Sequence, residues 1–131
     1  MKNLLTILSV CLITMNSIGQ AFQKTFGGAG VDIGNAVQQT ADGGFIILGN
    51  ASSFGAGLND VYLIRTNANG DTLWTKSFGE AGEDFGNSVQ QTADGGFIIA
   101  GYTNSFGAIG YDVYLIKTDS TGVISWAKTY G

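Results

Sequence analysis

Apolar residues in this chain gather in short runs that are separated by glycine-rich polar turns. The runs FIILG at 45–49 and VYLI at 61–64 are apolar at consecutive positions, and similar runs stand at 97–101 and 113–116. Continuous apolar runs of this length are typical of strands that are covered on both faces. The pattern therefore predicts inner β-strands that lie between two other layers.

The chain also repeats itself. The eleven residues at 37–47, VQQTADGGFII, return unchanged at 89–99. Residues 25–76 align with residues 77–128 without a gap, and 32 of these 52 positions are identical. A period near fifty residues indicates an array of structural units. We therefore divide the chain into two repeats at these bounds, with the start of a third repeat at 129–131.

Each repeat is predicted to hold four antiparallel strands. The central ADGG turn is a strong hairpin signal because aspartate and glycine tolerate the backbone angles that tight turns require. The longer SFG loop and a second glycine turn separate the remaining strands. The predicted strands are 33–40, 44–51, 60–67 and 71–77 in the first repeat, and 85–92, 96–103, 112–118 and 123–129 in the second.

This arrangement favours an all-β fold with two propeller blades, and a stacked β-solenoid is the alternative. Residues 22–27 align with 74–79 and with 126–131, so residues 20–24 are expected to begin an orphan outer strand. A closed propeller ring typically needs four to eight blades. We therefore expect part of a larger propeller, completed by further blades of the same or another chain. Closure of a short chain by self-association is the alternative.

The composition removes several classes of function. Glycine accounts for 21 residues, proline is absent, and the formal net charge is −4. Histidine is absent and Cys11 is the only cysteine, which excludes Ser-His and Cys-His catalysis, disulfides within the chain and His/Cys zinc sites. We do not expect nucleic acid as a partner, because the basic residues form no cluster along the sequence. They are Lys2, Lys24, Arg65, Lys76, Lys117 and Lys128.

The first nineteen residues have the pattern of a secretory signal peptide. Lys2 provides the positive start, an apolar run follows at 4–15, and the small residues Ser17 and Gly19 have the spacing that a signal peptidase recognises. The run is shorter than the roughly 20 residues that a membrane-spanning helix needs. We expect cleavage before Gln20, or alternatively before Phe22, which would leave no integral membrane segment. The predicted destination is the exterior or the cell surface.

Between residues 26 and 131 the motifs VQQT.DGGFII, SFG and DVYLI recur at a spacing of 52 residues, and FGG at 26–28 returns as FGE at 78–80. This pattern resembles the FGG/DGG β-propeller repeats of large secreted proteins in Gram-negative bacteria, many of which carry a type IX secretion sorting domain. The resemblance implies an extracellular or outer-membrane-associated array of blades.

Several residues are predicted to serve the repeat itself. Trp74 and Trp126 each follow a glycine by four positions, which resembles the tryptophan-docking motif of quinoprotein propellers and implies packing between blades. No quinone or other cofactor follows from that packing role, because a shared fold does not imply a shared function. Asp42-Gly43 and Asp94-Gly95 are predicted to shape the hairpin turns.

One acidic cluster is confined to a single repeat. Glu80, Glu83 and Asp84 lie close together in the sequence, and oxygen ligands of this kind suit calcium. A solvated loop is the alternative reading of the same residues. This cluster is the calcium candidate of the sequence, and no other metal is expected.

Contacts with a partner are predicted on the long loops, because loops on a rigid scaffold commonly carry function. Phe54, Phe106 and Tyr111 lie in or beside these loops. Tyr102 is a further aromatic candidate, whereas Tyr62 and Tyr114 are expected in the core.

We therefore expect a non-enzymatic, exported scaffold that contacts an unknown protein or glycan. The alternative is part of a propeller enzyme, either a quinoprotein-like oxidoreductase or a glycan-active enzyme, whose catalytic residues lie in blades outside this sequence.

Overall fold

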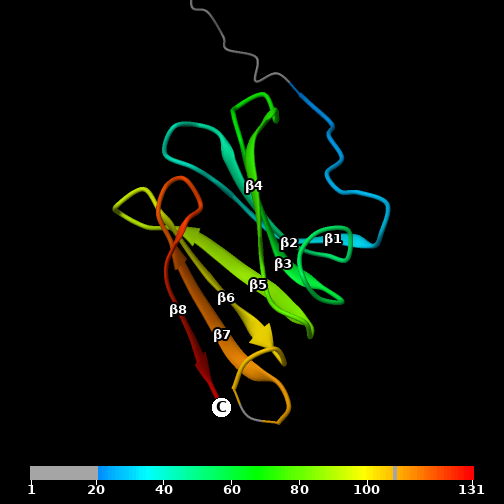
Figure 1. Cartoon of the computed structure of the whole chain (residues 1–131). Helices are drawn as coiled ribbons and strands as arrows, with labels where there is room; N and C mark the ends of the chain where they lie inside the picture. Colours follow the sequence, from blue (N-terminus) through cyan, green and yellow to red (C-terminus); the bar gives the residue numbers. More distant parts are fainter. Residues whose placement is uncertain (1–20, 108) are drawn as a thin grey trace, which may run out of the picture.

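The computed structural model describes residues 21–107 and 109–131, which form β-strands and no helix. The first four strands are β1 (Asp32–Gln39), β2 (Phe45–Ala51), β3 (Asp60–Thr66) and β4 (Thr72–Phe78). The other four are β5 (Asp84–Gln91), β6 (Phe97–Thr103), β7 (Asp112–Thr118) and β8 (Ile124–Tyr130). They build two four-stranded antiparallel sheets, each with its strands in chain order (Figure 1). Within the described ranges, no helix is long and apolar enough to cross a membrane.

The two sheets repeat each other in register as well as in sequence. Leu48 of β2 is opposite Leu63 of β3, and at the same place in the second sheet Ala100 is opposite Leu115. The bulge that follows Gly34 in β1 also has its equivalent in β5. A bulge increases the local twist of a strand, so both sheets are bent at the same point.

The hairpin between β1 and β2 turns at ADGG, as does the hairpin between β5 and β6. Gly43 has a φ angle of 87° and Gly95 one of 82°, in the left-handed region that glycine adopts without steric cost. The amide of Gly43 donates to the carbonyl of Thr40 at 2.9 Å, and the second hairpin repeats this bond. The predicted hairpins are confirmed.

All eight predicted strands are present, and their ends differ from the predicted bounds by at most one residue. The last strand of each sheet runs on to Phe78 or Tyr130. The start of the third repeat, predicted at 129–131, is therefore mostly the end of β8, and the structural unit closes slightly later than the sequence period.

The orphan outer strand predicted to begin at 20–24 is not formed, since residues 21–28 belong to no strand. A strand needs a hydrogen-bonded neighbour, and the blade that this segment would complete is not one of the two described sheets, each of which has four strands of its own. The segment instead lies along the first sheet and contacts it through side chains. The predicted signal peptide, residues 1–19, lies outside the described residues.

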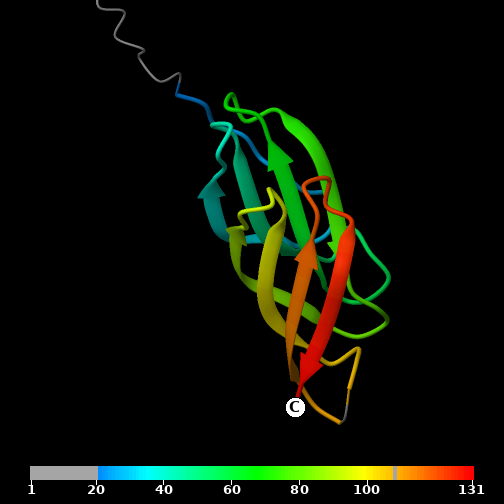
Figure 2. The same cartoon turned by 90° about the vertical axis from the view of Figure 1, so that its left-hand side faces the viewer.

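The two sheets pack against each other, and β5 of the second sheet contacts β1, β2 and β3 of the first (Figure 2). A continuous apolar core fills the space between them. Its buried members are Ile46, Leu48, Val61, Leu63, Phe78, Val89, Phe97, Ile99, Tyr114 and Ile116. A smaller cluster of Ala51, Tyr62 and Ile64 lies on the opposite face of the first sheet, under Phe26.

Candidate functional site

Asp42 is a structural residue of the first hairpin. Its carboxylate accepts hydrogen bonds from the Thr40 hydroxyl at 2.7 Å and from the Gly44 amide at 3.1 Å, and it forms an ion pair with Arg65 at 2.5 Å. These bonds, above all the one from Thr40, lower the pKa of Asp42 to about 2. The ionised carboxylate thus joins the hairpin to the neighbouring strand β3.

Asp94 plays the same part in the second hairpin. It accepts hydrogen bonds from Thr92 and from the amide of Gly96, and it pairs with Lys117 at 2.9 Å. The hydroxyl of Thr92, followed by Lys117, lowers the pKa of Asp94. Because both hairpins use their aspartate in the same way, these residues maintain the repeat and provide no asymmetric reaction centre.

The two tryptophans occupy equivalent positions but different environments. Trp74 packs edge-on against Phe97 of the second sheet, with 5.9 Å between ring centroids, and its ring lies over Gly122. Trp126 is 41% exposed, and its ring has the ammonium of Lys128 at 5.8 Å from its centroid. Trp74 therefore joins the two sheets, while Trp126 projects from the free side of the second sheet.

The calcium candidates do not form one cluster. Asp84 is fully buried and accepts hydrogen bonds from the Ser105 hydroxyl at 2.6 Å and from the Glu80 amide at 3.1 Å. Glu83 accepts the hydroxyl proton of Tyr111, and Glu80 is exposed. In the part of the chain that the structure describes, no three histidine, cysteine, aspartate or glutamate side chains are grouped for a metal ion.

Asp84 instead meets a second buried carboxylate, Asp60 of β3. Both carboxyl groups lie against Gly79, so closely that a β-carbon added to this glycine would clash with each of them. In each aspartate the oxygen Oδ1 is buried without a hydrogen-bond partner. Burial, together with the charges of Asp84 and Glu80, raises the pKa of Asp60. Sequence reasoning missed this pair because its members come from different sheets. The only available signal was that both aspartates recur in each repeat.

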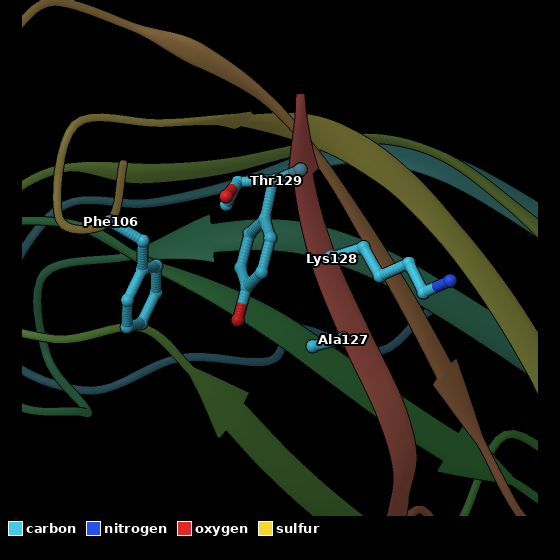
Figure 3. A pocket seen from close by; sticks show the side chains of 5 residues that line it. Phe106, Ala127, Lys128 and Thr129 are labelled. Carbon is cyan, nitrogen blue, oxygen red and sulfur yellow. The ribbon is translucent and has the colours of Figure 1, made fainter. Parts of the chain in front are cut away.

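The loop phenylalanines cover tyrosines of the core. Phe54 stacks on Tyr62 with 5.0 Å between ring centroids, and Phe106 leans on Tyr114 at 5.4 Å. Burial raises the pKa of Tyr114 to about 12. Phe106 and Tyr114 also line one side of a pocket of about 300 Å³ (Figure 3). Residues 127–129 of β8 line its other side.

An exposed group of aromatic rings interrupts the repeat at the loop end of the second sheet. Phe85 stacks on Tyr102 at 4.8 Å, and Tyr102 meets Tyr111 edge-on at 5.4 Å. The hydroxyl of Tyr111 donates to Glu83, and this bond raises the pKa of Tyr111. We call Phe85, Tyr102, Tyr111 and Glu83 the aromatic platform.

The first sheet has no such platform. At the equivalent positions it carries Ile33, Asn50, Asn59 and Val31. All four platform residues thus differ between repeats that are otherwise mostly identical. Sequence analysis singled out Tyr102, Tyr111 and Glu83 separately but omitted Phe85. A comparison of the two repeats position by position could have found the group.

Comparison with known proteins finds no family model that matches this chain. A search of curated proteins likewise finds no match.

Proposed function

We propose that this protein is an exported, non-enzymatic scaffold built from two propeller blades, and that the aromatic platform contacts a glycan or a protein outside the cell. The blade arrangement is supported by two four-stranded meanders of the same register that pack face to face. The export proposal rests on the signal-like sequence at residues 1–19.

The observation that carries the contact proposal is the break in the repeat at the platform. Tyr111 is 54% exposed and Tyr102 is 37% exposed. Tyrosine offers a rigid apolar ring together with a polar hydroxyl, so it contributes much contact area at little cost in conformational entropy. The neighbouring carboxylate of Glu83 adds an acceptor for hydroxyl groups. Ring faces beside a hydroxyl acceptor suit a sugar, so a glycan is the favoured ligand.

Binding to immobilised glycans tests this proposal. The chain from Gln20 onward is applied to a set of bacterial and host polysaccharides and, in parallel, to extracellular proteins. Binding to at least one glycan is expected, with a loss of about tenfold or more in affinity for Tyr111→Ala and for Tyr102→Ala. Asn59→Ala, which changes the equivalent position of the first sheet, is the matched control and should bind normally.

If the chain binds an extracellular protein and this binding needs Tyr102 and Tyr111, the ligand of the platform is a protein and not a glycan. Glycan binding that survives both substitutions would refute the platform as the contact site. Export is tested separately by determining the N-terminus of the protein recovered outside the cell, which should be Gln20 or Phe22.

A further inference from the structure

The interface between the two sheets has two different halves. The first sheet contributes Ile46, Leu48 and Val61, each with no exposed surface. The second sheet contributes its opposite face, where the backbone of Gly86 lies against the side chains of Leu48 and Val61. Because the sheets are repeats, each sheet also carries most of the half of this interface that it does not use here: the second sheet keeps Ile98 and Val113, while Ala100 stands in place of Leu48.

These unused halves are exposed at the two ends of the molecule. On the second sheet Val113 is 55% exposed, whereas its equivalent Val61 is completely buried. On the first sheet Val37 is 65% exposed, whereas its equivalent Val89 is only 6% exposed. A β-carbon added to Gly34 would meet nothing, although one added to its equivalent Gly86 would meet Leu48. The two free faces therefore complement each other.

Polar bonds across the buried interface follow the same logic. The Asn35 amide donates to the carbonyl of Gly86 at 2.7 Å, and the Gly86 amide donates to Asn50 at 2.8 Å. The side-chain oxygen of Gln91 accepts from the backbone amide of Ala41 at 2.9 Å, and the backbone amide of Gln91 donates to the side-chain oxygen of Gln38 at 2.7 Å.

Three of these four bonds can recur between two molecules. The free faces keep the equivalent side chains at the same positions of the repeat: Asn87 for Asn35, Gln39 for Gln91 and Gln90 for Gln38. The fourth is lost because Tyr102 stands in place of Asn50.

From this repetition we infer that two copies of this chain dock head to tail. The first sheet of one copy packs against the free face of the second sheet of the other copy. Trp126 then takes the position over Phe45 and Gly70 that Trp74 holds over Phe97 and Gly122. A contact between two different patches generates a closed ring or an open filament. This inference does not depend on the proposed function.

The docking site for Trp126 is covered in the single molecule by the chain's own N-terminal segment, residues 22–26. Phe22 packs edge-on against Phe45 at 5.7 Å and lies over Gly70, which closely matches the contact of Trp74 with Phe97 at 5.9 Å. Lys24 pairs with Asp71 at 3.0 Å.

Phe26 completes this cover by packing on the cluster of Ala51, Tyr62 and Ile64. The segment thus imitates the last strand of a preceding sheet. It competes with β8 of the arriving copy and weakens self-association.

Disulfide trapping tests the geometry directly. Asn59 and Glu83 form a parallel β-bridge between the two sheets, and the equivalent pair in the docked dimer is Tyr111 of one copy with Val31 of the other. Cysteines in bridge-paired positions are close enough to form a disulfide. Cys11 lies in the predicted signal peptide, so the chain from Gln20 has no other cysteine.

A mixture of the Val31→Cys chain and the Tyr111→Cys chain should yield the mixed disulfide dimer well above the homodimers. The Asn59→Cys/Glu83→Cys chain is the positive control and should close its disulfide within one molecule. Closure in the control with only random dimers in the mixture would overturn the inference.

Sedimentation or light scattering of four single variants tests the competition. Gly34→Val should weaken association while leaving the folded monomer unchanged, because its side chain enters open space in the monomer and would meet Val113 of the other copy in the docked dimer. Trp126→Ala should weaken association by about tenfold or more. Two other variants should strengthen association. Phe22→Ala loosens the N-terminal cover, and Tyr102→Asn restores the fourth polar bond.

Tyr102→Asn also separates this inference from the proposed function, because it should strengthen association and weaken glycan binding. A folded Phe22→Ala or Tyr102→Asn chain that remains monomeric up to millimolar concentration would refute head-to-tail docking. Association that Gly34→Val leaves unchanged would refute it as well.

Discussion

The carboxyl groups of Asp60 and Asp84, which begin strands in different sheets, meet against the backbone of Gly79 in the interior. Two carboxylates in one buried site repel each other, so the site favours a proton on one of them. Burial and the charge of Asp84 accordingly raise the pKa of Asp60. A raised pKa in the folded protein stabilises it at low pH, and this contribution is lost as the pH rises through the folded pKa.

Asp60→Asn should therefore increase the free energy of unfolding at pH 7, by about 1 kcal/mol or more, since the amide removes one charge and can donate to Asp84. The increase should shrink as the pH falls toward 4. Urea unfolding at several pH values measures this. A decrease in stability at pH 7 would show that both charges are needed there.

Asp42 should have the opposite pH dependence. Its pKa is lowered to about 2 by Thr40, Gly44 and Arg65, so the ionised form stabilises the folded state above about pH 4. This contribution is lost as the pH falls toward 2. Asp42→Asn should reduce the free energy of unfolding at pH 6, and this difference should disappear as the pH falls through about 2.

Circular dichroism during acid titration would follow the loss. Arg65→Lys is the matched control for the ion pair, because the second hairpin already uses Lys117 at this place. It should be tolerated.

The two tryptophans should differ in their effect on stability. Trp74→Ala removes the packing on Phe97 and Gly122, and we expect a loss of about 2 to 3 kcal/mol, below the roughly 3 to 5 kcal/mol of a fully buried tryptophan because Trp74 is only partly buried. Trp126→Ala should change the stability of the monomer by less than about 0.5 kcal/mol. Chemical unfolding at low micromolar concentration provides the comparison. Equal losses would contradict the assignment of Trp74 alone to the junction.

Alanine substitutions at two glycines with similar backbone angles distinguish the cost of backbone strain from the cost of side-chain packing. Gly122 has a φ angle of 79° and Gly43 one of 87°. Alanine at either position pays for the left-handed backbone, about 1 to 2 kcal/mol. Only Gly122→Ala also places a methyl group against the ring of Trp74, whereas Gly43 faces open space. Thermal unfolding should therefore show the greater loss for Gly122→Ala.

Local features of this protein were predictable from its sequence because they depend on neighbours along the chain. The ADGG turns and the apolar runs located all eight strands to within one residue. Hairpins join strands that are adjacent in sequence, so the turn residues and the alternation of glycine-rich and apolar segments are sufficient to place them. The aromatic platform could have been recognised in the same way, from Phe85 and Tyr102 as departures from the repeat.

Contacts between the repeats were not predictable in this way. The orphan strand is not formed because its hydrogen-bonding partners would be strands of another blade, whereas each of the two described sheets has four strands of its own. The calcium cluster failed to gather because Asp84 turns into the core toward Asp60, while Glu83 turns outward to Tyr111. Residues that are close in sequence thus reach opposite environments.

The sequence by itself determined two nearly identical four-stranded units and the turns that connect their strands. Only the tertiary structure decided which copy of each repeated residue is buried, as Trp74 and Trp126 demonstrate. The physical reason is that the units share their local hydrogen bonding and differ in their neighbours. Burial is a property of the surface that another element covers, and two identical segments are covered differently when one lies inside the stack and the other at its end.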